Sequence, residues 1–201
     1  DYELNEFLFE KYKNKECEDL KCISSKFNNL LNDSLLHLVN LQQLTFGLFF
    51  NQSLYDSLSN LTNLEQLTFG HKFNKPLDDS LSNLINLKQL TFNYDFNQPL
   101  GDSLSNLINL EQLTFGRVFN QQLDNSLSNL TNLQQLNFGC FFDQPLGDSL
   151  SNLTNLQELT LGGFFGRFFD QPLCDSLSNL VNLEKLSGFN QLDNSLLNLP
   201  N

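Results

Sequence analysis

The sequence predicts an α/β repeat solenoid, in which a parallel β-sheet forms one face and short helical or irregular turns form the other. The first observation is a period: a Ser-Leu dipeptide opens a similar block eight times, at spacings of 23 residues five times and then 27 and 19. The second is a set of seven apolar positions that recur in most periods. One period cannot bury seven apolar side chains alone, so neighbouring periods must stack to shield them. In the period that begins at Ser57, the apolar positions are Leu58, Leu61, Leu64, Leu67, Phe69, Phe73 and Leu77.

The spacing within a period predicts where the strand lies. The leucines recur every third residue, which suits a segment rich in turns, and the spacing then changes to two at residues 66–69. Alternation in a strand places Leu67 and Phe69 inward and leaves Gln66 and Thr68 facing out. Strands of neighbouring periods would pair in parallel, about 4.8 Å apart. We therefore expect Leu67, Leu90 and Leu113 to lie side by side in the interior.

Two columns of Asn recur with the same period. An Asn present once per coil can bond the backbone groups of tight turns, which would otherwise be buried without partners. Because buried polar groups require such partners, we interpret both columns as structural ladders and not as ligand sites. The columns are Asn40, Asn63, Asn86, Asn109, Asn132, Asn155 and Asn182, and Asn28, Asn51, Asn74, Asn97, Asn120, Asp143, Asp170 and Asn190.

A third polar column stands just before each Ser-Leu. Asp or Asn at this place can cap a short helical turn on the outer side of each coil. Its acidic oxygens, one coil apart, would also suit calcium, but capping explains the column without a metal. We expect no metal site here. The column is Asp33, Asp56, Asp79, Asp102, Asn125, Asp148, Asp175 and Asn194.

The repeat divides the chain into two parts. Residues 1–26 fall outside the period and are predicted to form an N-terminal capping segment, and residues 27–201 are predicted to form a solenoid of about eight 23-residue coils. Leu4, Phe7, Leu8 and Tyr12 have helical spacing, so the segment would cover the open first coil as an amphipathic helix, or dock another chain. Because the sequence begins at Asp1 and contains no Met, we expect it to be part of a longer product.

The repeat motif resembles a known family. The pattern LxxLxxLxF with recurrent Asn resembles leucine-rich repeat proteins, and the continuation FNQPL at residues 96–100, with variants at 73–77 and 119–123, resembles the FNIP-type repeat. That repeat is known from amoebae and from the giant viruses that infect them. The resemblance implies a binding or assembly role, located in the host cytoplasm or in the virion if the protein is viral. Family members often carry an F-box and are thought to present substrates to a ubiquitin ligase, but residues 1–26 are too short for one.

The charge and cysteine content exclude several classes of protein. The 11 Lys and Arg residues against 23 Asp and Glu residues give a net charge of −12, which argues against binding nucleic acid through its phosphates. No apolar run is long enough to cross a bilayer, so we expect no membrane insertion. The four cysteines have no metal-ligand spacing. Cys17 and Cys22 could form a bridge, although reduced thiols in a cytoplasmic setting are expected.

The sequence offers no catalytic constellation. His37 and His71, the two histidines, stand in different columns, and neither is accompanied by a recurring acid or nucleophile. There is no phosphate-binding Gly loop, no Gly-x-Ser-x-Gly elbow and no helix with paired histidines. By the criteria for an active site we predict no enzyme, no catalytic residues and no cofactor.

Two groups of residues are candidates for contact with a partner. Phe164, Phe165 and Phe168 are surplus to the core column that Phe169 continues, so they either fold back over the core or form an exposed patch. Phe49 and Phe141, each beside a core Phe, are weaker candidates of the same kind. The second group is the outward row of the strands, which is uniform and short of Tyr, Trp and Arg. It comprises Gln66, Thr68, Gln89, Thr91, Gln112 and Thr114.

These features predict a noncatalytic module for protein–protein interaction or self-assembly, such as a structural component of a giant-virus particle. The alternative is the substrate-recognition part of an F-box-type ubiquitin ligase adaptor, which rests on the resemblance alone. A third hypothesis is binding of ice or a glycan by the flat Gln and Thr rows.

Overall fold

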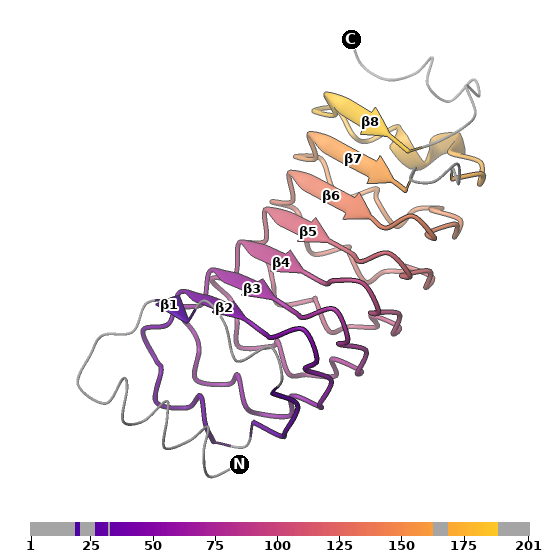
Figure 1. Ribbon diagram of the computed structural model, residues 1–201. Helices are drawn as coiled ribbons and strands as arrows, with labels where there is room; N and C mark the ends of the chain where they lie inside the picture. The colour runs from indigo at the N-terminus through magenta and orange to yellow at the C-terminus, as the bar shows by residue number, and fades with distance from the viewer. Residues whose placement is uncertain (1–18, 21–26, 32, 163–168, 189–201) are drawn as a thin grey trace.

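The chain folds into a solenoid whose coils stack along one axis (Figure 1). The computed structural model describes residues 19–20, 27–31, 33–162 and 169–188. In this part of the chain, eight strands form one parallel sheet and lie in the order of the sequence. The predicted parallel sheet is therefore confirmed. The strands are β1 (Asp19–Leu20), β2 (Gln43–Thr45), β3 (Gln66–Thr68), β4 (Gln89–Thr91), β5 (Gln112–Thr114), β6 (Gln135–Phe138), β7 (Glu158–Leu161) and β8 (Lys185–Ser187).

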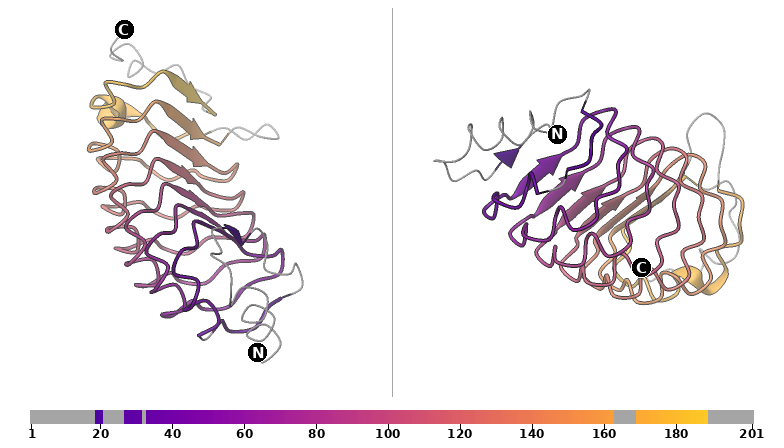
Figure 2. Two further views of the ribbon diagram at one scale, coloured as in Figure 1. Left: turned by 90° about the vertical axis from the view of Figure 1, so that its left-hand side faces the viewer. Right: turned by 90° about the horizontal axis from the view of Figure 1, so that it is seen from below.

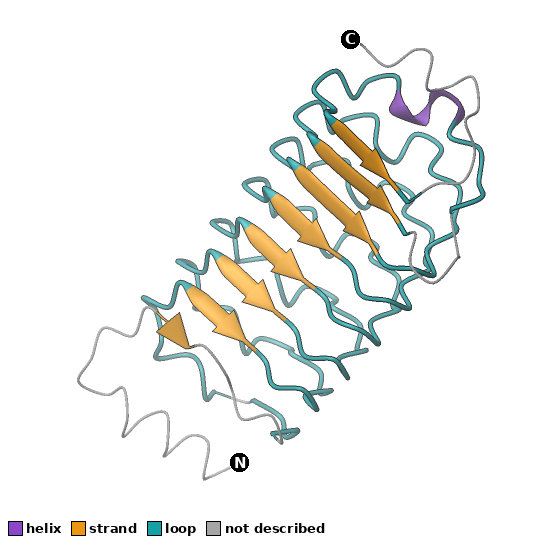
Figure 3. Cartoon of the chain, turned by 45° about the horizontal axis from the view of Figure 1, so that its top comes forward, coloured by secondary structure: helices purple, strands orange, loops and turns teal. Residues whose placement is uncertain are grey.

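The register of the sheet follows the sequence period. Leu67 of β3 is paired with Leu90 of β4, and Leu90 is paired with Leu113 of β5. All three side chains are fully buried. The strand arrows in Figure 3 lie side by side and point the same way. The predicted interior row of leucines is confirmed, and a 23-residue period places identical residues opposite one another.

The outer side of each coil is built from turns, not helices. In one coil the backbone nitrogen of Leu61 donates to the carbonyl oxygen of Leu58, and that of Leu64 donates to Leu61, both at 3.0 Å. Each such hydrogen bond closes a turn between two leucines that are three residues apart, which explains why the leucines recur at every third position. The described residues include a single helix, the 3₁₀-helix η1 (Cys174–Leu177), visible in Figures 2 and 3. Of the two conformations expected for this side, the irregular turns predominate.

The acidic column before Ser-Leu belongs to these turns. The carbonyl oxygen of Asp56 accepts a hydrogen bond from the backbone nitrogen of Ser59 at 2.9 Å, and the Asp56 side chain is exposed. The neighbouring Ser side chains turn inward instead. The hydroxyl of Ser80, for example, donates to the carbonyl oxygen of Leu77 at 2.5 Å. The column therefore marks the start of a series of turns, where a short helix was expected.

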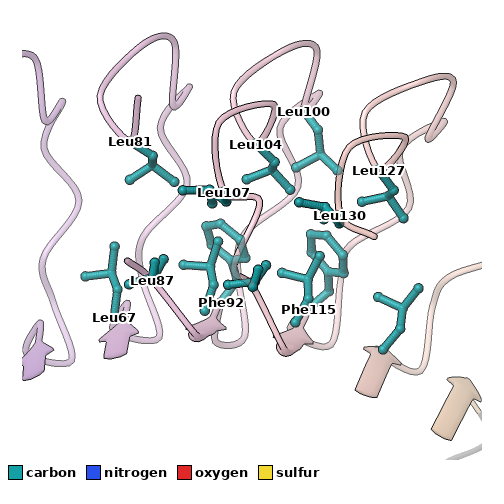
Figure 4. Close-up of a cluster of buried hydrophobic side chains, with 14 of the residues drawn as sticks. Leu67, Leu81, Leu87, Phe92, Leu100, Leu104, Leu107, Phe115, Leu127 and Leu130 are labelled. Carbon is teal, nitrogen blue, oxygen red and sulfur yellow. The ribbon is translucent and has the colours of Figure 1, made fainter. Parts of the chain in front are cut away.

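Phenylalanines fill the interior on the side of the coil that follows the strand (Figure 4). The ring of Phe96 stacks on Phe73 at 6.0 Å and on Phe119 at 6.1 Å, one coil away in each direction. Within its own coil, Phe96 lies 4.0 Å from Phe92. All of these rings are buried. Two parallel rows of stacked rings therefore run along the solenoid, and each ring contacts its equivalents in the neighbouring coils.

The Phe row continues across the irregular coil. Phe142 and Phe169 are 27 residues apart, yet their rings stack at 6.0 Å and 9°, like the pairs at 23-residue spacing. Strands β7 and β8 also pair in the regular register, with Leu159 opposite Leu186. The prediction that Phe169 continues the core column is confirmed. The four extra residues therefore leave the stacking of the coils unchanged.

The second Asn column forms the predicted ladder. The side-chain oxygen Oδ1 of Asn74 accepts a hydrogen bond from the backbone nitrogen of Asn97 at 2.9 Å. The first Asn column is also a ladder, but it uses the amide nitrogen: Nδ2 of Asn86 donates to the carbonyl oxygen of Thr62 at 2.9 Å. Both columns therefore hold successive coils together, as the rule for satisfying backbone polar groups requires.

Two further ladders were not predicted. Asn83 and its equivalents donate Nδ2 to a carbonyl oxygen of the preceding coil, in this case that of Ser59 at 3.0 Å. Gln98 donates Nε2 to Oδ1 of Asn74 at 3.0 Å, which adds a second donor to that oxygen. The signal was the recurrence of Asn and Gln in these columns, which is as regular as in the two columns that were recognised. The other members are Asn60, Asn106, Asn129, Asn152 and Asn179, and Gln52, Gln121, Gln144 and Gln171.

The first strand of the sheet, β1, comes before residue 27. Asp19 of β1 is opposite Gln43 of β2, and Leu20 is opposite Leu44, so the sheet includes residues that precede the expected boundary. The positions of the expected amphipathic helix, Cys17 and Cys22 lie outside the described residues. The division into a segment of residues 1–26 and a solenoid of residues 27–201 stays a prediction.

Candidate functional site

The predicted strand-face residues lie in two rows that follow the register of the sheet. Gln66, Gln89 and Gln112 are opposite one another in β3, β4 and β5, and Thr68, Thr91 and Thr114 form the parallel row. All six side chains are half-buried, and each strand presents the same pair. The structure therefore brings these candidates together as one uniform surface. Their role in binding stays a prediction.

The predicted aromatic contacts fall into two cases. Phe164, Phe165 and Phe168 lie outside the described residues, so their role stays a prediction. Phe49 is 47% exposed, and Phe141 is half-buried with the guanidinium of Arg117 at 5.2 Å from its ring centroid. Phe49 and Phe141 occupy the same position of different coils, directly before the buried ring of the second Phe row. This shared position leads to a surface that the sequence reasoning did not recognise.

We call this surface the variable flank. It consists of the two residues that lie between the end of each strand segment and the second Phe row, in five successive coils. The core and ladder columns repeat nearly the same residues, but the residue pair at these two positions is different in each of the five coils. The signal that could have revealed it is this loss of repetition inside a regular array. The variable flank comprises Leu48 and Phe49, His71 and Lys72, Tyr94 and Asp95, Arg117 and Val118, and Cys140 and Phe141.

Backbone hydrogen bonds join the variable flank from coil to coil. The nitrogen of Lys72 donates to the carbonyl oxygen of Leu48 at 3.0 Å, and the nitrogen of Asp95 donates to that of His71 at 2.9 Å. The same bond joins the next coils, from Val118 to Tyr94 at 3.2 Å and from Phe141 to Arg117 at 3.1 Å. The flank is thus a second ladder beside the sheet. Its side chains are held on a fixed backbone, which lowers the entropy lost on binding a partner.

Glycine permits the close approach of the coils beside this ladder. A methyl group on Gly70 would lie 1.9 Å from the carbonyl oxygen of Gly47, and one on Gly139 would lie 1.9 Å from that of Gly116. These distances are far below any real contact, so Gly at positions 70 and 139 lets the flank of one coil lie directly on the next. In an intervening coil the position is occupied by Asn93, whose amide nitrogen donates to the carbonyl oxygen of Phe69 at 2.5 Å.

The side chains of the flank also contact one another along the solenoid. The ring of His71 stacks on Tyr94 at 6.1 Å, and the guanidinium of Arg117 lies 5.2 Å from the centroid of Tyr94. Nη1 of Arg117 donates to the hydroxyl of Tyr94 at 2.6 Å. Lys72 forms an ion pair with Asp95 at 3.0 Å. Rings and charges of three successive coils therefore make one continuous platform that combines aromatic, cationic and acidic groups.

The described residues contain no group of three or more His, Cys, Asp or Glu that could hold a metal ion. Cys140, on the variable flank, is a free thiol. In the same part of the chain, no helix is long and apolar enough to cross a bilayer.

Comparison with known proteins shows the fold and not a family. No protein-family model matches the sequence, and no curated protein is similar to it. Among solved structures, an internalin (inlF) from Listeria monocytogenes is 22% identical with a TM-score of 0.66, over 89% of this chain and 52% of that one. TLR13, in a complex with ssRNA13, is 21% identical with a TM-score of 0.73, over 89% and 26%.

A third solved structure is CroV588, described as a novel circular LRR protein. It is 23% identical with a TM-score of 0.61, over 87% of this chain and 28% of that one. The present chain thus spans about half the length of the internalin and about a quarter of the other two proteins. The parallel sheet, the turn-built outer side and these similarities together show that the chain has the leucine-rich repeat fold.

Proposed function

We propose that this chain is a noncatalytic protein-binding module that recognises its partner through the variable flank. The observation that carries the proposal is the contrast between columns: the core and ladder columns repeat from coil to coil, whereas each of the five coils carries a different residue pair on the flank. A surface that repeats one residue pair offers the same contact many times and cannot distinguish partners well. A surface with a different pair in every coil can match one partner and exclude others.

The composition of the flank also suits a protein interface. Tyr and Arg are enriched among the residues that dominate binding energy, and the flank holds Tyr94 and Arg117 in contact. The strand face, in contrast, presents rows of Gln and Thr. The leucine-rich repeat fold of the chain, shared with an internalin, is consistent with a binding role.

Site-specific photocrosslinking tests the proposal. A benzophenone amino acid replaces Phe49 on the flank or Ile85 on the outer turns, which are 47% and 49% exposed. After irradiation in an extract of the native source, we expect a discrete protein adduct from position 49 and none from position 85. A third probe at Thr68 reports on the strand face. Adducts from position 85 or 68 without one from position 49 would contradict a role of the flank.

For the setting of this module we propose assembly within a giant-virus particle, either in the host cytoplasm or in the virion. The support is the resemblance of the repeats to the FNIP type. The alternative setting is substrate recognition in an F-box-type ubiquitin ligase. Antibody detection of the chain in purified particles, compared with its co-purification with ligase subunits, separates the two.

The strand face supports a second candidate function, binding of a repetitive ligand such as ice or a glycan. The supporting observation is the pair of in-register rows of Gln and Thr. Thermal hysteresis or retention on a glycan array by the purified chain would favour it. A null result in both assays removes it.

A further inference from the structure

Cations outnumber carboxylates in one part of this acidic protein. In the segments that follow β3, β4 and β5, at residues 70–76, 93–99 and 116–122, Lys72, Lys75 and Arg117 stand against one carboxylate, Asp95. The whole chain carries a net charge of −12. The turns on the outer side hold the acidic column and no cation in the same coils. The middle of the variable flank, together with the adjacent Lys75, therefore carries more cations than carboxylates on a negative molecule, which attracts an acidic partner.

The two ends of the flank are apolar. Leu48 and Phe49 form the first coil of the flank, and both side chains are exposed. Val118 and Phe141 lie toward the other end and are half-buried. An exposed pair such as Leu48 and Phe49 on an otherwise polar surface offers apolar area to a ligand. The order along the solenoid is thus apolar, cationic and apolar.

The length of the flank sets the size of the ligand. Equivalent rings on the flank are 6.1 Å apart from one coil to the next, as His71 and Tyr94 show. Four such steps from Leu48 to Cys140 give roughly 24 Å, which an extended chain covers with roughly seven residues. The hydrogen bonds between the flank backbones join each coil to the next over this whole length.

We propose that the variable flank binds an extended acidic segment of a partner protein, laid along the solenoid axis, with Asp or Glu in its middle and apolar residues at both ends. This inference rests on the proposed function and specifies the chemistry of the partner. Asp and Glu of the segment contact Lys72, Lys75 and Arg117, and its apolar ends contact Leu48, Phe49 and Phe141. A single-stranded nucleic acid would also offer negative charge, but three cations beside a carboxylate neutralise few phosphates, so the observations favour the peptide.

A peptide selection tests the chemistry. A random 12-residue peptide library displayed on phage is selected on the full chain, and binders that also bind a Lys72→Glu/Lys75→Glu variant are removed. We expect the selected peptides to have acidic centres and apolar ends, and their affinity to fall when NaCl is raised from about 0.05 to 0.5 M, because salt screens exposed charges. Neutral or basic selected peptides, or none after the counter-selection, overturn the proposal. Preferential binding of a single-stranded RNA of the same length also overturns it.

A matched pair of variants tests the location. Lys72→Glu/Lys75→Glu is compared with Lys88→Glu/Lys185→Glu, which makes the same change of net charge beside the strand face. Lys88 and Lys185 form exposed ion pairs with Glu65 and Glu158, as Lys72 does with Asp95. Both variants therefore lose ion pairs, and this loss alone cannot account for a difference in their affinity. Fluorescence anisotropy with a selected peptide should show affinity at least about tenfold weaker for the flank variant, and within about twofold of the parent for the control.

The outcomes separate this inference from the proposed function. Equal loss in both variants, or loss only in the control, contradicts an acidic segment on the flank. If photocrosslinking from position 49 still captures a protein in that case, the binding role stands and only the chemistry of the partner is wrong. Circular dichroism of both variants confirms that the comparison is made between folded chains.

Discussion

The side-chain oxygen Oδ1 of Asn97 accepts a hydrogen bond from the backbone nitrogen of Asn120, one coil further on, at 2.8 Å. The same oxygen accepts from Nε2 of Gln121 at 3.1 Å. One atom thus satisfies a backbone donor and a side-chain donor of the next coil. Because a backbone N–H left without a partner in a partly buried site is costly, this relationship makes the Asn column a structural requirement.

Replacement of Asn97 with Ala should therefore lower the free energy of unfolding by about 1–3 kcal/mol, because it removes the acceptor and keeps the donors. Asn97→Asp is the matched control, since it retains the oxygen. Asp143 already fills this column and accepts from the backbone nitrogen of Asp170 at 3.2 Å. Urea unfolding followed by circular dichroism measures both. An equal loss of unfolding free energy in Asn97→Ala and Asn97→Asp would show that the acceptor oxygen does not account for the stability.

Replacement of Phe96 with Ala should lower the free energy of unfolding by about 3–5 kcal/mol, because it leaves a cavity in the core. The Phe96 ring is fully buried and stacks on three other rings. Phe49→Ala removes the same atoms from the surface and should change stability by less than about 0.5 kcal/mol. Chemical denaturation of the two variants makes the comparison. A loss below about 1 kcal/mol for Phe96→Ala would mean that the ring packs loosely.

Replacement of Tyr55 with Gly should raise the free energy of unfolding by about 0.5–1 kcal/mol, because it relieves a left-handed backbone conformation. Tyr55 has φ of 46° and is 69% exposed, whereas the equivalent Gly101 has φ of 49°. The reverse change, Gly101→Tyr, should cost about 1–2 kcal/mol. A Cβ at Gly101 meets no atom within 4 Å, so the change in stability reports the backbone strain and not a steric clash. Thermal melts that move in the same direction for both variants would refute the argument.

Replacement of Gly139 with Ala should lower the free energy of unfolding by about 1–3 kcal/mol, because the methyl group would press on the carbonyl oxygen of Gly116 and force the two coils apart. The surface change Ile108→Ala, on the outer turns, serves as the control for a generic substitution. Denaturant midpoints report both. Should Gly139→Ala be as stable as the parent, the coils must be able to separate locally without loss.

Much of the fold could be predicted because the period alone determines which residues become neighbours. Leu67, Leu90 and Leu113 had to pair once their strands stacked in register, and Phe169 had to follow Phe142 once four residues were taken as extra. The outer side was less determined. Leucines spaced by three fit both a short helix and a series of turns, and only the hydrogen bonds between carbonyl and amide three residues apart distinguish them.

The candidate site was harder to predict for the opposite reason. Residues such as His71, Tyr94 and Arg117 do not repeat, so a search for repetition passes over them. Their relationship exists only in three dimensions, where a separation of 23 residues becomes a side-by-side contact. Phe49 and Phe141 were recognised as surplus aromatics, but the polar partners between them were not. The strand-face rows were found easily, since they repeat like the core.

The coil between β7 and β8 has a further consequence for how such a protein can change. Four added residues are accommodated there, yet Phe142 still meets Phe169 and Leu159 still meets Leu186. Length can therefore be gained at this point of the array while the ring stacking and the strand register on either side are kept. A gene encoding repeats of this kind can acquire new loops by small in-frame insertions at the same place. Such proteins could then differ in their loops while the packing of the core stays the same.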